Sequence, residues 1–289
     1  MLSVGLCTQL ACIWEATARK PGNVHRFQDF TDLTYLDFLA SAAAIAPVLD
    51  RAREQRVGRT VLEGVRATRQ VVTTNTNLGI LLLLAPLAAV PEGKDIRSGV
   101  GRVLAKLNVE DARHVYEAIR LAEPGGLGQT ANQDVRQEPT MTLREVMELA
   151  KEHDLVARQY ANGFMEVFAL ADLPLDDGLK LTNSLEGAII SSQLALLAIR
   201  PDTLIARKRG IGEAERASQW AQQILQEQWP RNGKAWETFA AFDFWLRAEG
   251  HSRNPGTTAD LVTACLFVAL REGRIMLPPQ YPWALDFPR

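Results

Sequence analysis

Apolar residues recur at helical spacing along almost the whole 289-residue chain. Two early stripes consist of Leu2, Leu6, Leu10, Ile13 and Trp14, and of Leu36, Leu39, Ala43 and Ala46. The same spacing predicts further helices over 59–73, 77–90, 95–107, 111–122, 142–171, 179–199, 212–228, 233–249 and 257–272. No pair of alternating segments is joined by a hairpin signal. The sequence therefore predicts an all-α fold, arranged as a single compact domain over residues 1–289.

Five connections between these helices combine proline or glycine with polar or charged residues: 18–30, 73–79, 123–140, 200–210 and 250–260. Glycine allows backbone to approach a ligand closely, and binding residues concentrate in loops on a rigid scaffold. The polar stretch 129–140 has the composition of a mobile lid or of a simple linker. We expect the functional residues in these connections and at the adjoining helix ends.

Composition and charge indicate the cellular compartment of the protein and the classes of partner it can bind. The formal net charge of −2 gives no support to a nucleic-acid partner. The first residues lack a basic region typical of a signal peptide, and the most apolar segment, 78–90, is short for a membrane span and contains Pro86. The three scattered cysteines are typical of buried thiols in a reducing compartment. We expect a cytoplasmic protein without a membrane partner, and a homodimer is compatible with the sequence.

The first candidate for chemistry is Glu15, which is followed by Lys20, Pro21 and Gly22 at a sharp turn. A lysine beside such a turn can meet phosphate oxygens as a compact point charge. The alternative is a helix end with a solvated lysine.

Two further connections have the character of anion sites. Residues 73–79 place a polar run before a very apolar helix, whose N-terminus is suited to binding an anion; a simple N-cap is the alternative. Residues 123–128 hold three glycines in four positions, which could wrap an anion or merely end a helix.

Glu186 lies among apolar residues of a predicted helix, where an unpaired carboxylate would be costly. It must be protonated, bound to a cation, or held in a structural ion pair. Downstream lie Asp202, Thr203 and a basic cluster over 207–209. Carboxylates suit Mg²⁺, and arginines suit phosphate oxygens.

The last connection contains Arg253 and Asn254 before Thr257 and Asp260. Thr257 and Asp260 have the spacing of a capping box, which leaves Arg253 and Asn254 without a structural explanation. Asp154 and Arg158 have the spacing of an exposed helical ion pair, with phosphate binding by Arg158 as the alternative.

In order and spacing, these segments resemble the triphosphoribosyl-dephospho-CoA synthase family across most of the chain. The resemblance rests on Glu15 with 20–22, on 75–79, on Asp202 with Thr203, and on 255–261. Asn77 and Leu78 stand where the best-known members have His and Lys, and His25 stands where Asp is usual. The chain is thus similar to a divergent branch associated with archaea and one-carbon-metabolising bacteria.

The resemblance implies that the 2′-hydroxyl of 3′-dephospho-CoA displaces adenine from C1′ of ATP, with Mg²⁺ as cofactor. It implies three groups of residues: catalytic Glu15, His25 and Asn75; metal-binding Glu186, Asp202 and Asp260; and ATP- or phosphate-binding Lys20, Gly22, Asn77, Gly79, Gly125, Gly126, Arg158, Thr203, Arg207, Arg209, Arg253 and Asn254. Glu15 is expected to be the base, and His25 or Asn75 to assist the leaving adenine. Two other hypotheses are phosphoribosyl transfer to a different acceptor, for example in methanopterin-type cofactor biosynthesis, and a non-enzymatic helical interaction protein.

Overall fold

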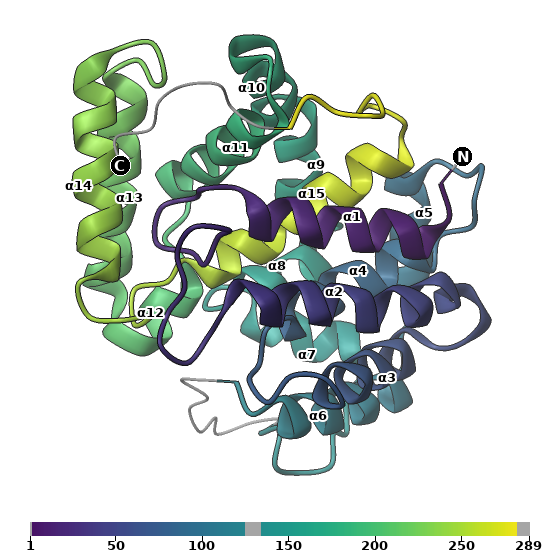
Figure 1. Ribbon diagram of the computed structural model, residues 1–289. Coiled ribbons are helices and arrows are strands. Elements are labelled where there is room, and N and C mark those ends of the chain that lie inside the picture. Colours follow the sequence, from purple (N-terminus) through teal and green to yellow (C-terminus); the bar gives the residue numbers. More distant parts are fainter. Residues whose placement is uncertain (1, 125–133, 282–289) are drawn as a thin grey trace.

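The computed structural model describes residues 2–124 and 134–281, and throughout these ranges the regular elements are helices (Figure 1). They are α1 (Val4–Thr17), α2 (Tyr35–Asp50), the 3-10 helix η1 (Ala52–Glu54), α3 (Val57–Arg69), α4 (Leu78–Ala88), α5 (Ile96–Leu104), α6 (Val109–Ala122), α7 (Leu143–Ala150), α8 (Leu155–Asn162), α9 (Met165–Asp172), α10 (Pro174–Thr182), α11 (Leu185–Ile199), α12 (Thr203–Arg209), α13 (Ile211–Gln226), α14 (Gly233–Arg247) and α15 (Gly256–Arg271). The predicted all-α fold is confirmed.

Helices α1 and α2 lie side by side and run in opposite directions across the front of the molecule (Figure 1). Each begins at a side-chain cap: the Ser3 hydroxyl accepts the Leu6 N–H, and Thr34 forms a capping box with Asp37. Behind them, every residue of α4 except Gly79 is buried, which confirms the predicted buried helix. Cys7 and Cys12 are buried on α1 and are not in disulfides, as expected for structural thiols.

Two long helices expected from the apolar spacing are interrupted. The predicted helix 142–171 is three helices, because Asp154 caps the start of α8 and the chain turns through left-handed backbone at Gly163 and Phe164. The predicted helix 179–199 is split between the end of α10 and α11, because Asn183 ends α10 in a left-handed conformation with φ of 49°. Conversely, α12 is a helix within a predicted connection, capped by Asp202.

The buried apolar residues form two clusters joined by α11. The larger cluster is built around α1, α4 and α15, and the smaller one fills the space between α11, α13 and α14. Helices α13 and α14 stand side by side at one edge of the molecule, and α11 runs toward them from the interior (Figure 1). In the smaller cluster Trp229 stacks on Phe239 with ring centroids 4.6 Å apart. Because residues of α11 belong to both clusters, the two cores meet along one helix.

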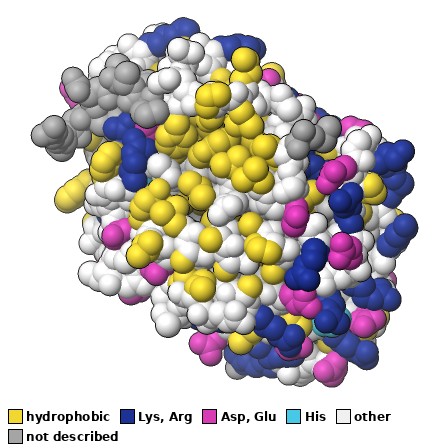
Figure 2. All heavy atoms as spheres, turned by 45° about the vertical axis from the view of Figure 1, so that its right-hand side comes forward, with side chains coloured by type: hydrophobic (Ala, Val, Ile, Leu, Met, Phe, Trp, Pro, Cys, Tyr) yellow, Lys and Arg dark blue, Asp and Glu magenta, His cyan; other side chains and the backbone are white. Residues whose placement is uncertain are grey.

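On the face shown in Figure 2, apolar side chains gather into a broad patch, whereas Lys, Arg and acidic side chains intermix along its edge. Patches of this kind are often used for association. The homodimer nevertheless stays a prediction. Among the described residues no single helix is long and apolar enough to cross a membrane; α11 and α12 reach that length together, but they are bent by 58° at their junction.

Candidate active site

All five predicted connections contribute to one cavity of about 960 Å³. Helices α6, α7, α8 and α12 line it, together with the end of α1, the segment that precedes α4, and the start of α15. A volume of this size lies in the range of small-molecule sites. Of the residues expected to be functional, the cavity brings together Glu15, Asn75, Asn77, Gly79, Arg207, Asn254 and Asp260.

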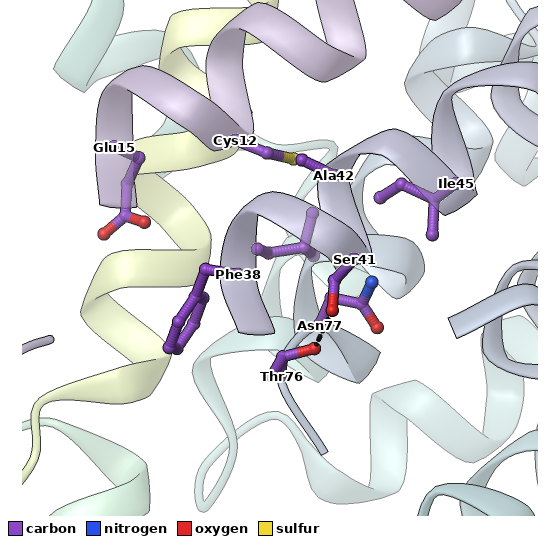
Figure 3. Close-up of a pocket in the computed structure, with 9 residues that line it drawn as sticks. Cys12, Glu15, Phe38, Ser41, Ala42, Ile45, Thr76 and Asn77 are labelled. Carbon is purple, nitrogen blue, oxygen red and sulfur yellow. Dashed lines mark hydrogen bonds between the residues drawn. The ribbon is translucent and has the colours of Figure 1, made fainter. Parts of the chain in front are cut away.

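Glu15 reaches the cavity from the last turn of α1 and is 4% exposed. Figure 3 shows its carboxylate beside Phe38, next to a small space of about 10 Å³ that lies between α1, α2 and the start of α4. The Lys20 ammonium lies 2.9 Å from the Glu15 carboxylate and donates to the Glu15 carbonyl oxygen at 2.5 Å. Burial raises the pKa of Glu15, and the charge of Lys20 opposes that rise.

Lys20 was expected at the phosphates, but its side chain is buried and does not line the cavity. Its ammonium is occupied by Glu15 and by backbone carbonyls. We therefore correct its role: Lys20 is the buried counter-ion of Glu15.

Asp260 faces the same cavity from the second turn of α15 and packs against the first turn of α4. A Cβ at position 79 would lie 2.0 Å from Oδ2 of Asp260, so this approach requires glycine there. Burial, and then the nearby charge of Glu15, hold the pKa of Asp260 well above its ordinary value. The predicted capping box is wrong, since no side chain caps α15 and the Thr257 hydroxyl instead accepts from the Thr203 hydroxyl at 3.2 Å.

The polar run before α4 is partly structural and partly turned toward the cavity. The Asn77 amide bonds the Thr68 hydroxyl at 2.9 Å, and the Thr76 and Ser41 hydroxyls are 2.6 Å apart (Figure 3). Asn75 is exposed, lines the cavity, and accepts the Leu78 N–H through Oδ1 at 3.2 Å. Its amide nitrogen can therefore act as a donor beside the start of α4.

A cationic wall faces these carboxylates from α12. Arg207 and Lys208 both line the cavity. Arg207 Nη1 lies 3.4 Å from Oδ2 of Asp154, and the Lys208 ammonium donates to the His251 carbonyl oxygen at 3.3 Å. Burial, followed by the charge of Arg207, lowers the pKa of Lys208.

Four cavity residues were not assigned to the site from the sequence, although the sequence singled out Asp154 as a possible partner of Arg158 and Lys208 as part of the basic cluster: Arg69, Asp154, Lys208 and His251. The signal for Lys208 was present, because a helix over 203–209 places positions 204, 207 and 208 on one face, and all three line the cavity. Asp154, which was paired with Arg158 on spacing alone, instead contacts Arg207.

Glu186 was expected to bind metal, but it does not line the cavity and is fully buried. The Arg19 side chain donates to it through Nε at 2.8 Å and Nη2 at 2.9 Å, and Arg26 Nη2 donates at 3.0 Å. The structural ion pair, which the sequence left open as the alternative, is what the structure contains.

Asp202 is also fully buried and away from the cavity. Its Oδ1 accepts the N–H groups of Leu204 and Ile205, and its Oδ2 accepts the N–H and hydroxyl of Thr258. Asp202 thus joins the starts of α12 and α15 instead of binding metal. Thr203 does not line the cavity either; its hydroxyl accepts the Leu155 N–H at 3.3 Å and links α8 to this junction.

His25 does not line the cavity, and its expected role as a proton donor is corrected. Burial, followed by the charges of Arg247, Lys20 and Arg26, lowers the pKa of His25 to about 3, so the imidazole is neutral near pH 7. Its Nδ1 accepts the Phe27 N–H at 3.3 Å.

The remaining phosphate-binding expectations concern residues with structural partners or outside the described ranges. Gly22, with φ of +75°, donates to Asp243 at 2.7 Å and packs against Leu246 and Pro255. The three arginines that do not line the cavity are held by acids: Arg158 by Glu166 at 2.8 Å, Arg209 by Glu249 at 2.7 Å, and Arg253 by Glu213 and Glu249. Gly125 and Gly126 lie outside the described residues.

Comparison with known proteins identifies the family. The sequence profile of the ATP:dephospho-CoA triphosphoribosyl transferases matches residues 1–277. The chain belongs to this family. A crystal structure of a proposed triphosphoribosyl-dephospho-CoA synthase from Archaeoglobus fulgidus is similar, with 28% sequence identity and a TM-score of 0.62 over 81% of this chain and 99% of that one. No curated protein matches the chain.

Membership of the triphosphoribosyl transferase family shows that the protein is a transferase, which overturns the hypothesis of a non-enzymatic interaction protein. The family description names ATP and dephospho-CoA, two substrates that carry polyphosphate or diphosphate groups. The cationic side chains of α12 and the N-terminus of α4 give this transferase complementary charge at one part of its cavity.

The carboxylates of the cavity are suited to a divalent cation. In residues 2–124 and 134–281, no group of three or more His, Cys, Asp or Glu side chains is arranged to hold a metal by itself. Mg²⁺, however, usually takes one or two carboxylates together with substrate phosphates. Glu15 and Asp260 crowd negative charge into a buried place, which raises the pKa of Asp260 and which a cation would relieve.

Proposed function

We propose that this protein transfers the triphosphoribosyl group of ATP to the 2′-hydroxyl of 3′-dephospho-CoA, releasing adenine, with Mg²⁺ as cofactor. The observation that carries the proposal is the convergence of Glu15, Asp260, Arg207 and Lys208 on a single cavity. This set offers a base, a carboxylate for the cation, and two cations for phosphates.

Arg207 and Lys208 would bind the triphosphate of ATP, because both cations reach the cavity from the same helix. Arg207 remains paired with Asp154 at 3.4 Å, which orients its guanidinium, and Lys208 is oriented by the His251 carbonyl oxygen. Asn254, whose Oδ1 accepts from Asn23, gives a further amide at the same cavity.

Asp260 is the carboxylate best placed to hold Mg²⁺, since Glu186 and Asp202 have their oxygens occupied elsewhere. Asp260 would hold Mg²⁺, and the ion would supply neutralisation of phosphate charge. Gly79 leaves room for the Asp260 carboxylate beside α4, so the donor set depends on that glycine.

Glu15 would accept the proton of the acceptor's 2′-hydroxyl while the oxygen of that hydroxyl attacks C1′ of ATP. The new C1′–oxygen bond forms while the C1′–N9 bond breaks through an oxocarbenium-like transition state. The electron pair of the broken bond leaves with adenine, which takes up a proton from solvent, and Glu15 then releases to solvent the proton that it accepted. The Lys20 ammonium, 2.9 Å from the Glu15 carboxylate, opposes the rise in the pKa of Glu15 that burial causes. The Asn75 amide, at the cavity beside α4, would donate a hydrogen bond to the departing base.

Adenine release tests the proposal. The purified chain is incubated with ATP, Mg²⁺ and dephospho-CoA, and free adenine is measured by chromatography beside a known synthase. Adenine that depends on all three components is the expected result. No adenine above an enzyme-free control, while the known synthase is active, rejects this reaction and leaves a different ribosyl acceptor as the alternative.

A further inference from the structure

One side of the cavity is apolar and is built by α6 and α7. Positions 143, 146, 147 and 150 follow one face of α7, whereas Arg144, Glu145 and Glu148 are exposed on the other. Apart from Tyr116, the side chains that these two helices present to the cavity have no conventional hydrogen-bonding group: Val115, Ile119, Leu143, Val146, Met147, Leu149 and Ala150. We call these seven residues the apolar wall.

The apolar wall is not sealed inside the protein. Leu149 is 57% exposed, and Ile119, Val146 and Ala150 are partly exposed, although all four line the cavity. Ordinary core packing would cover such a face, so it is available to an uncharged part of a ligand.

The two substrates of the proposed reaction differ in the chemistry that could cover this wall. ATP consists of a triphosphate, a ribose and a base with polar edges, and each of these has hydrogen-bonding requirements. Dephospho-CoA shares an adenosine diphosphate portion but also carries a pantetheine arm, which is long and uncharged and has methyl, methylene and thiol groups beside its two amides and its hydroxyl. Burying those groups against aliphatic side chains is favourable, whereas turning a triphosphate toward them is not.

The charged groups of the cavity strengthen this distinction. Arg207 and Lys208 belong to α12, and Asp260 belongs to α15, whereas the apolar wall belongs to α6 and α7. Figure 1 shows α12 and α6 at separate places around the lower part of the molecule. Phosphates and metal therefore have α12 and α15, and an uncharged arm has α6 and α7. The charged cavity residues at the end of α6, Arg69 and Glu123, lie 3.9 Å apart and pair with each other.

We propose that the apolar wall binds the pantetheine arm of the acceptor and makes this chain selective for an acceptor that carries such an arm. The inference rests on the proposed function, because it takes dephospho-CoA as the acceptor. Val146 and Ala150 are specificity-determining residues in this arrangement, and they take no part in the bond changes at C1′.

The test compares the affinities of dephospho-CoA and ADP, which share the adenosine diphosphate portion; ADP lacks the arm and carries one more ionisable oxygen on its terminal phosphate. Binding is measured by calorimetry with the full chain, Mg²⁺ and a saturating C-nucleoside triphosphate. The base of this ATP analogue is attached through carbon and is not displaced. In the wild type we expect dephospho-CoA to bind at least about tenfold more tightly than ADP, which corresponds to about 1.4 kcal/mol.

Val146→Asp should reduce that ratio toward one, while the affinity for the triphosphate stays within about twofold, a change of less than about 0.4 kcal/mol. Val146→Leu keeps the wall apolar and should retain the preference. Phe244→Asp places the same charge at a 77% exposed position on α14 that does not line the cavity, and it should also retain the preference. Ala150→Asp repeats the test one turn further along α7 if Val146→Asp does not fold.

A wild-type ratio near one, or a ratio unchanged in both folded aspartate variants, would overturn the inference. Equal loss of affinity for the triphosphate would overturn it as well, because the wall would then serve both substrates. Failure of the proposed function is distinguishable, since the wild type would then release no adenine whatever the binding ratios are.

Discussion

Replacing Glu186 by glutamine separates a structural role from a metal-binding role. The Glu186 side chain is 0% exposed, and its two guanidinium partners are only 14% and 21% exposed. Glutamine keeps the shape and one acceptor oxygen but removes the negative charge of Glu186 from between Arg19 and Arg26. Breaking a buried ion pair from one side typically costs about 3–5 kcal/mol. Because both arginines retain some contact with solvent, we expect a loss near the lower end, about 3 kcal/mol.

For a chain of this length that loss corresponds to a melting temperature lower by roughly 6 °C. Urea unfolding of the wild type and of Glu186→Gln, with and without Mg²⁺, measures the loss in the free energy of unfolding. Glu63→Gln is the matched control, because Glu63 pairs with Arg59 at the surface, where the interaction is worth under about 1 kcal/mol. If Glu186→Gln is as stable as the wild type and instead loses its response to Mg²⁺, the structural assignment is refuted.

Three further predictions concern the cavity. Arg207→Ala should raise KM for ATP about tenfold or more, because Arg207 lines the cavity. Arg209→Ala removes a side chain that is paired with Glu249 outside the cavity, and it should leave KM for ATP nearly unchanged. Steady-state kinetics of the two variants tests this difference. Asp260→Asn should abolish adenine release yet stabilise the fold at neutral pH. Because the pKa of Asp260 is raised in the folded state, its contribution to stability is present below the unfolded-state pKa and is lost as pH rises through the folded-state pKa. Unfolding measured at pH 5 and pH 8 would contradict this prediction if the variant were less stable than the wild type at both. Lys20→Met removes the buried cation that opposes the raised pKa of Glu15, so in folded enzyme the acid limb of the kcat–pH profile should move to higher pH, and an unshifted limb would argue against Glu15 as base.

Local patterns in the sequence were sufficient for the all-α fold and for the connections that form the cavity, but they missed the breaks within 142–171 and 179–199 and the helix α12. Apolar spacing located the buried helix α4, and glycine-rich polar connections marked the places that meet at the cavity. Asp260 and Gly79 were both expected at the site, and their close contact explains why position 79 is a glycine.

The partners of buried charges could not be predicted in this way. Glu186 finds Arg19 and Arg26 at separations of 167 and 160 residues, a pairing that only the packed fold determines. Lys20 has its counter-ion five residues away, but the sequence does not reveal that the pair is buried. The same charges therefore supported a metal or phosphate site and a structural pair equally well until their surroundings were known.

The most direct test is a crystal structure of the full chain with Mg²⁺, dephospho-CoA and a C-nucleoside triphosphate, whose base cannot be displaced. We predict the triphosphate against Arg207 and Lys208, the cation on Asp260, and the acceptor 2′-hydroxyl within hydrogen-bonding distance of Glu15. A triphosphate bound away from this cavity, or a cation held by Glu186 or Asp202, would contradict the proposed active site.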